Sequence, residues 1–227
     1  MRRYLFGENK NMRDLGGYCT IDNKETKFNR FIRSDLPLNM SDEEKNYLIK
    51  NNITTIIDLR NSDELLRKPN CLNAKSFNFY NIELNGGDFP NLEEDIPKGY
   101  LDIVDDTKKI KEIFNIILSS KGNVLFNCTA GKDRTGIISM LLLLIAKVPE
   151  VDIIADYEVS YTYIKELVII MHELHQDWPA FVGNSKPEYM EQTLKLFKEK
   201  YSSVDNYLKI LGFKKSDIKK LQNKLLD

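Results

Sequence analysis

The sequence predicts an α/β fold with a central, mostly parallel β-sheet flanked by helices and with extra helices in the C-terminal part. Two observations point to this class. Short apolar runs typical of buried strands alternate with segments of helical periodicity between residues 53 and 146. Such alternation favours parallel strands joined by right-handed crossovers. After residue 146 the pattern is helical throughout, which adds helices rather than a second sheet.

The N-terminal part contains signals for a hairpin and for one capped helix. Residues 18–21 and 27–32 suggest the two strands of a hairpin with a slightly long loop. Ser41 and Glu44 match a capping box, in which each side chain accepts a hydrogen bond from the backbone N–H of the other residue. We therefore expect a helix over residues 42–50.

The middle of the chain alternates strands and helices. Residues 53–59 predict a buried strand, and Ser62 is placed to cap the short helix that follows. Residues 76–84 predict another strand. Residues 85–97 contain two glycines and two prolines and predict a long loop, a kind of segment that is often functional. Residues 98–120 have the periodicity of a helix.

The C-terminal part predicts helices at residues 150–175, 187–200, 204–211 and 217–226. Ser203 and Ser216 are plausible caps of the last two. The chain contains no repeat, low-complexity segment or convincing linker. We therefore expect residues 1–227 to form one domain, with a helical C-terminal part at about residues 150–227.

The composition narrows the class of protein. With 227 residues, 42% of them hydrophobic, the chain can bury a real core. A formal net charge of −1 gives no basic field, so we expect no nucleic-acid partner. Cys19, Cys71 and Cys128 show neither a paired framework nor CxxC spacing, which indicates a reducing compartment and no structural zinc. Because neither a signal peptide nor a membrane-spanning segment is found, we expect a cytoplasmic protein, with export by a signal-independent route left open.

Residues 121–146 carry the most informative pattern. A short apolar strand at residues 123–127 is joined to a buried helix by a small loop, which holds Cys128 and Arg134 with five residues between them. Free N–H groups and the positive dipole end at a helix N-terminus bind anions and favour a thiolate. An arginine fork fits two oxygens of a phosphoryl group. Residues 128–134, the cysteine loop, therefore suggest a cysteine-dependent phosphatase, whose chemistry needs no metal or cofactor.

The segment CTAGKDRTG, from Cys128 to Gly136, has the C-x5-R-[ST] signature of protein tyrosine phosphatases. Four other segments extend the likeness over nearly the whole chain: NMRDLGGY from Asn11, RFIRSDLP around Arg33, IIDLRNSDE from Ile56 and IADYEVS from Ile154. Together they resemble the bacterial tyrosine-phosphatase-like family, whose members include secreted lipid and tyrosine phosphatases. The resemblance implies a cysteine-phosphatase-like fold.

The resemblance also implies roles for single residues. Cys128 would attack phosphorus and form a thiophosphate intermediate, while Arg134 would hold the phosphoryl oxygens. The substrate-binding positions would be Thr129, Ala130, Gly131, Lys132 and Thr135. Lys132 adds a second cation, which suggests substrates with more than one phosphate, and Thr135 either stabilises the departing thiolate or caps the helix. The supporting residues would be Arg13, Asp14, Asp58 and Arg60, the last two placed at the carboxyl end of a strand.

The general acid stays open at this level. Asp133, inside the loop, resembles an in-loop acid of the family, and the alternatives are the upstream aspartates Asp88, Asp102, Asp105 and Asp106. The expected activity is that of a protein tyrosine phosphatase, with dual-specificity and lipid phosphatases as variants. Its substrates would be phosphoproteins or phosphoinositides. The alternative is a catalytically silent phosphate-binding module, although such a module would normally have lost Cys128 or Arg134.

Overall fold

The computed structural model describes residues 2–86 and 92–226. Among these residues, strands β1 (Arg13–Asp14), β2 (Phe31–Ser34), β3 (Ile53–Asp58), β4 (Asn78–Asn81) and β5 (Asn123–Asn127) form one sheet in the order β1-β2-β5-β3-β4. The β1 strand is antiparallel to β2, and the other neighbours are parallel. The predicted mostly parallel sheet is confirmed.

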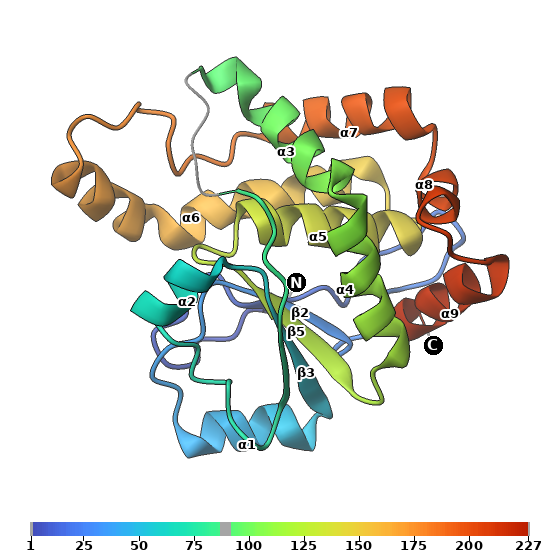
Figure 1. Ribbon diagram of the computed structural model, residues 1–227, viewed down its shortest axis with the longest axis horizontal. Coiled ribbons are helices and arrows are strands. Elements are labelled where there is room, and N and C mark those ends of the chain that lie inside the picture. Colours follow the sequence, from blue (N-terminus) through green and yellow to red (C-terminus); the bar gives the residue numbers. More distant parts are fainter. Residues whose placement is uncertain (1, 87–91, 227) are drawn as a thin grey trace.

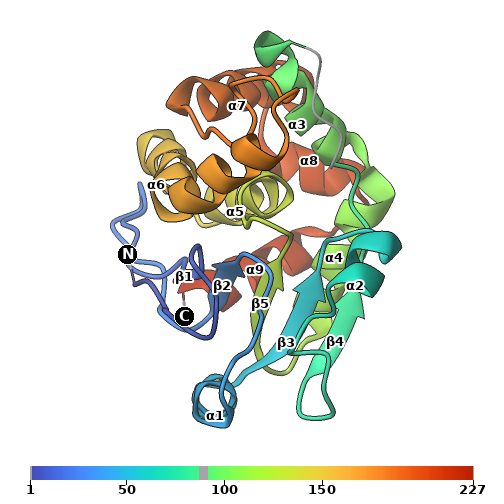
Figure 2. The ribbon, with the colours of Figure 1, turned by 90° about the vertical axis from the view of Figure 1, so that its left-hand side faces the viewer.

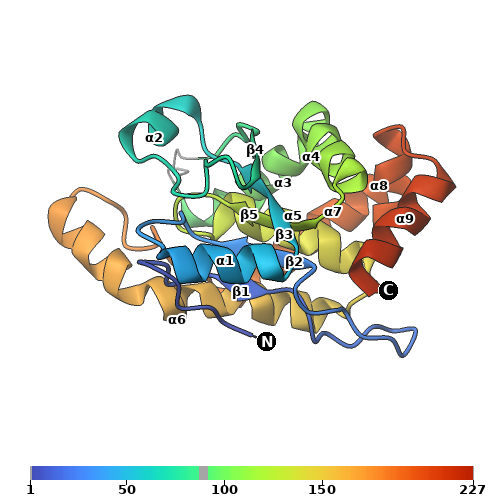
Figure 3. The same ribbon diagram turned by 90° about the horizontal axis from the view of Figure 1, so that it is seen from below.

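Helices make up most of the rest of the chain (Figures 1 and 3). They are α1 (Asp42–Lys50), α2 (Ser62–Arg67), α3 (Ile96–Asp105), α4 (Thr107–Ser119), α5 (Asp133–Ile145), α6 (Glu150–Leu174), α7 (Pro187–Tyr201), α8 (Val204–Ile210) and α9 (Lys215–Leu226), with a 3-10 turn η1 (Glu93–Asp95) before α3. The helical segment expected at residues 98–120 is two helices, because the chain turns at Asp106 and this side chain caps α4.

The sheet is covered on both faces, and its side chains alternate between them. Val124 and Phe126 of β5 join a large core that includes residues of α3 to α9, whereas Leu125 joins a smaller core with Leu48 of α1. Figure 2 shows α1 on one side of the sheet and α5, α6 and α7 on the other. Strand β5 is therefore buried from both faces and flanked on both edges.

The segment from β5 to α5 agrees with the sequence prediction. Eleven of the thirteen residues of α5 are buried, so this helix packs on all sides, as its nearly continuous apolar sequence requires. The cysteine loop is thus held between a central strand and a central helix. Among the helices of the described residues, none combines the length and apolarity needed to cross a bilayer.

Some local predictions were wrong. The expected hairpin is shorter than predicted: residues 17–20 pair with residues 24–26 through backbone hydrogen bonds and the Cys19–Glu25 bridge. Residues 31 and 32, expected in its second strand, belong instead to β2, which lies between β1 and β5. The cap of α2 is Asn61, not Ser62, since the Asn61 side chain accepts from the Glu64 N–H. Ser203 does cap α8, whereas Ser216 lies inside α9. The other capping box, Ser41 with Glu44, is confirmed.

Candidate active site

Three parallel strands end side by side where the cysteine loop begins. Ser34 of β2 and Asp58 of β3 are both register partners of Asn127, the last residue of β5. Cys128 follows directly, and α5 begins at Asp133. The loop therefore lies at the carboxyl edge of the sheet, where open α/β folds bind their ligands.

The two residues that define the loop are buried beside each other. Cys128 is 3% exposed and Arg134 is 5% exposed. Burial by itself lowers the pKa of Arg134, but its hydrogen bonds with Glu64 and the neighbouring Cys128 raise that pKa above the usual value. The guanidinium is thus a permanent cation next to the thiol.

The backbone of the loop presents free donors. Among the described residues, none accepts a hydrogen bond from the N–H groups of residues 129–134. The first four N–H groups of a helix lack an intrahelical partner, and those of Lys132, Asp133 and Arg134 at the start of α5 are among the free donors of the loop. Together with the helix dipole, they form a site for an anion.

Glu64 of α2 binds Arg134, and the sequence reasoning missed it. Its carboxylate accepts from Arg134 Nη1 at 2.7 Å and from Nη2 at 2.8 Å, and the Thr129 hydroxyl donates to the same carboxylate. Burial by itself would raise the pKa of Glu64, but these hydrogen bonds lower it to about 2. The sequence did contain a signal for this residue, since Glu64 is the last residue of the motif IIDLRNSDE.

Asp58 and Arg60 support α2, and Asp58 also accepts from the Asn70 amide, which donates to the side chain of Asn127 just before Cys128. Arg60 pairs with Asp58 at 2.8 Å and donates to the backbone carbonyls of Glu64 and Lys68. Both side chains are almost fully buried. The pair therefore holds the helix that presents Glu64 and does not face the anion site itself.

Asp133 is held by one of its two carboxylate oxygens. Its Oδ1 accepts from the Tyr100 hydroxyl and lies 3.1 Å from Lys132 Nζ. The Tyr100 hydroxyl is also 2.6 Å from the Tyr157 hydroxyl, and burial together with the charge of Asp133 raises the pKa of both phenols. Oδ2 has no hydrogen-bond partner among the described residues.

Lys132 is a buried residue, only 6% exposed, and not a solvated surface lysine. Its ammonium group donates to the backbone carbonyl of Asn184 at 2.6 Å in addition to pairing with Asp133. The segment between α6 and α7 is thereby fixed to the cysteine loop. An ammonium group has three N–H donors, so one is left for a ligand.

The other residues predicted for the site differ in their distance from the cysteine loop. Arg13 pairs with Asp156 behind the loop at 2.9 Å. Asp14 binds the Tyr4 hydroxyl and the N–H groups of Gly16 and Asn29, away from the loop. Thr135 lies in the first turn of α5, so it is not the cap, and its buried hydroxyl has no partner among the described residues.

The alternative acids have other partners, are exposed, or lie outside the described residues. Asp105 binds Lys200 and the Tyr201 hydroxyl, and Asp106 caps α4. Asp102 is exposed on α3. Asp88 lies outside the described residues. Nearer to Arg134 is the backbone of Gly86, where an added Cβ would come within 3.2 Å of Arg134 Cγ.

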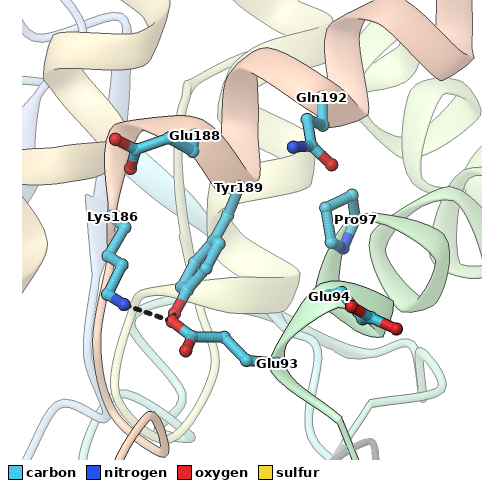
Figure 4. A pocket seen from close by; sticks show the side chains of 7 residues that line it. All are labelled: Glu93, Glu94, Pro97, Lys186, Glu188, Tyr189 and Gln192. Carbon is cyan, nitrogen blue, oxygen red and sulfur yellow. Dashed lines mark hydrogen bonds and ion pairs between the residues drawn. The ribbon is translucent and has the colours of Figure 1, made fainter.

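A surface cavity of about 610 Å³ lies between η1 and α7 and does not include the cysteine loop. Figure 4 shows its lining side chains, among them Glu93, which pairs with Lys186 at 2.5 Å and accepts from the Tyr189 hydroxyl. These contacts join the start of α3 to the start of α7. The buried loop, not this cavity, holds Cys128 and Arg134, so we take the loop as the candidate active site.

Residues 6–227 match the model of a family described as the tyrosine phosphatase family. The chain belongs to this family. As a tyrosine phosphatase family member it is similar to a tyrosine-protein phosphatase of Nostoc commune, at 27% identity over 216 residues, which cover 86% of this chain and 74% of the relative. A Cupriavidus necator protein assigned by name to the tyrosine-protein phosphatases is 25% identical over 220 residues, 88% of this chain and 80% of the relative. The resemblance seen in the sequence is confirmed, and the protein is a phosphatase.

In this tyrosine phosphatase family member, the fold brings Cys128, Lys132, Asp133 and Arg134 together as the sequence predicted. Sequence reasoning assigned no contact to Glu64, Tyr100 or Asn11. Glu64 and Asn11 stand in quoted motifs, whereas Tyr100 stands in none. Only the fold shows that its hydroxyl reaches the loop.

Proposed function

We propose that the protein hydrolyses phosphate monoesters through a thiophosphate intermediate on Cys128. Phosphotyrosine is the first substrate class, and phosphoserine, phosphothreonine and phosphoinositides are the others to be compared. One observation carries the proposal: a buried thiol and a buried guanidinium share a loop whose N–H groups find no acceptor in the described residues. This combination supplies both a nucleophile and a site for a phosphoryl group.

The chemistry has two steps. The Cys128 thiolate attacks phosphorus in line, a sulfur–phosphorus bond forms and the bond to the leaving oxygen breaks. Arg134 and the loop N–H groups stabilise the charge on the equatorial oxygens. A water molecule then attacks phosphorus, the sulfur–phosphorus bond breaks, and phosphate leaves.

Asp133 is the proposed general acid. Lys132 and Tyr100 hold Oδ1, so the free Oδ2 can carry a proton to the leaving oxygen in the first step. The same carboxylate then takes a proton from the attacking water, as reversibility requires. Asp105 and Asp106 are engaged elsewhere, which supports this choice.

Lys132 would set the preference for substrates with more than one phosphate, because one of its donors is left for a second phosphate. The test compares kcat/KM for a bisphosphorylated phosphoinositide and for p-nitrophenyl phosphate. Lys132→Met should lower the ratio of the two values about tenfold to 100-fold, the loss of one charged hydrogen bond. An unchanged ratio would limit Lys132 to holding Asp133 and Asn184.

The proposed mechanism is tested by turnover of p-nitrophenyl phosphate. The protein should hydrolyse it, Cys128→Ser should abolish turnover, and Cys19→Ser, at an exposed cysteine, should leave it unchanged. Wild-type protein that binds phosphate without turnover would instead identify a silent phosphate-binding module. A panel of phosphotyrosine, phosphoserine and phosphoinositide substrates then ranks the classes by kcat/KM.

A further inference from the structure

Two carbonyl groups of the cysteine loop are turned away from the anion site by residues of other elements. The Asn11 amide donates to the Ala130 carbonyl at 2.9 Å and to the Gly131 carbonyl at 3.0 Å. Arg33 Nη2 donates to the same Gly131 carbonyl at 2.8 Å. Both donors are completely buried.

The orientation of these carbonyls fixes the orientation of two N–H groups. In a planar trans peptide the C=O and the following N–H point in opposite directions, and the described residues contain no cis bond. The N–H groups of Gly131 and Lys132 therefore point away from Asn11 and Arg33. They are among the loop N–H groups that donate to no described residue.

Gly131 is required for this arrangement. Its φ is +65°, and an added Cβ would lie 2.4 Å from the backbone nitrogen of Asp35, at the end of β2. The loop backbone is therefore pressed against β2 on the same side as the Arg33 donor. A side chain at this position would force the two peptides to turn.

Asp156 of α6 fixes both donors from behind. Its carboxylate binds Arg33 Nη1 and, at 2.9 Å, Arg13 Nε, and Arg13 in turn donates to the Asn11 side-chain oxygen. All three charged side chains are at most 2% exposed. Two guanidinium groups against one carboxylate also leave a net positive charge behind the loop, which favours an anion in front of it.

We propose that Asn11 and Arg33 are positioning residues that aim the N–H groups of Gly131 and Lys132 at the bound oxyanion, and that Asp156 sets their geometry. The proposal rests on the proposed function of the cysteine loop and explains why NMRDLGGY, RFIRSDLP and IADYEVS converge on this loop. Each motif contributes one of these residues, and their shared task is to shape the backbone of the loop.

The test measures oxyanion binding and not only rate. Asn11→Ala removes both carbonyl contacts, and the matched control is Asn9→Ala. Asn9 is also buried, but its amide donates to Ser34, Asp35 and Leu36 and not to the loop. The inhibition constant of inorganic phosphate against p-nitrophenyl phosphate is measured for both variants, with the melting temperature as a check on folding.

Asn11→Ala should weaken phosphate binding at least about tenfold, while Asn9→Ala should change it less than about twofold at a similar loss of melting temperature. Equal changes in the two variants, or no change in Asn11→Ala, would overturn the proposal. If wild type neither binds phosphate nor turns over, the proposed function fails instead, so the two failures are distinguishable.

A second measurement does not depend on the folding of Asn11→Ala. In Cys128→Ser protein labelled with nitrogen-15, titration with inorganic phosphate should shift the amide signals of Gly131 and Lys132 more than those of residues outside the loop. Amide signals at these two positions that stay unchanged at saturation would contradict the inferred direction of the N–H groups.

Discussion

Glu64 accepts hydrogen bonds from both terminal nitrogens of Arg134, Nη2 also lies 3.5 Å from the Thr129 hydroxyl, and Nε has no hydrogen-bond partner among the described residues. A guanidinium has two edges that can each bind two oxygens. The carboxylate therefore fixes the arginine through Nη1 and Nη2, and the edge that carries Nε can face a phosphoryl group. This arrangement gives Glu64 a direct influence on the proposed reaction.

Glu64→Gln should lower kcat/KM for p-nitrophenyl phosphate about tenfold, because the arginine loses one charge-assisted hydrogen bond and its fixed orientation. The matched control is Asp63→Asn, at the exposed neighbouring position in α2. The measurement is kcat/KM from steady-state kinetics for wild type and both variants. Faster turnover and tighter phosphate binding in Glu64→Gln would mean that the carboxylate blocks the site, contrary to this prediction.

The same carboxylate should contribute to stability in a defined pH range. Its pKa is about 2 in the folded protein against the usual 4.5, so the stabilisation is fully present above pH 4.5 and is lost as the pH falls from 4.5 towards 2. Urea unfolding at about pH 5 and pH 3 should show a smaller loss of unfolding free energy in Glu64→Gln than in wild type. Glu64→Gln should still lose some unfolding free energy between pH 5 and pH 3. The reason is Asp156, whose pKa is also lowered, by Arg13 and Arg33 against the effect of burial.

Asp133→Asn should separate substrates by their leaving groups. A general acid contributes about 100-fold or more where the leaving oxygen is basic, and little where it is not. We expect kcat/KM for phenyl phosphate to fall about 100-fold and that for p-nitrophenyl phosphate to fall less than about threefold. Asp106→Asn, at the cap of α4, is the control. An equal loss on both substrates would exclude Asp133 as the acid.

Tyr100→Phe should reproduce part of that effect. The variant keeps the ring in the core and removes only the hydroxyl that holds Asp133 Oδ1. The rate on phenyl phosphate should fall about tenfold, near the lower end of what one hydrogen bond to a charged group contributes, with p-nitrophenyl phosphate nearly unaffected. Tyr201→Phe removes a hydroxyl that also binds a carboxylate, that of Asp105, and should leave both rates unchanged. If both tyrosine variants behave alike, Tyr100 has no special relation to the acid.

The parts of the structure that sequence predicted best are specified by neighbouring residues. The capping box of Ser41 and Glu44 and the run from β5 through the cysteine loop into α5 each depend on a few positions close in the chain. Their signals are hydrogen-bonding chemistry and apolar periodicity, which can be read directly. Cys128 and Arg134 belong to this class.

The predictions that failed or were never made depend on strand order. The second strand of the expected hairpin was wrong because residues 31–34 form β2 between β1 and β5, and no local pattern indicates that pairing. Glu64 meets Arg134 across 70 residues of sequence only because β3, which leads into α2, lies directly beside β5. Tyr100 meets Asp133 in the same indirect way, through packing of α3 on α5.

The carbonyl contacts behind the cysteine loop also govern how the site comes into existence. Asn11 and Ala130 are 119 residues apart in the chain, Arg33 and Gly131 are 98 apart, and Arg13 and Asp156 are 143 apart. Contacts of such separation form late, because large loops of chain must close before they are made. The signature CTAGKDRTG can therefore be synthesised, and even fold into a strand and a helix, long before it can bind an anion. Catalytic competence should emerge only when α6 docks, so a nascent chain still lacking that helix would contain Cys128 in an inactive form.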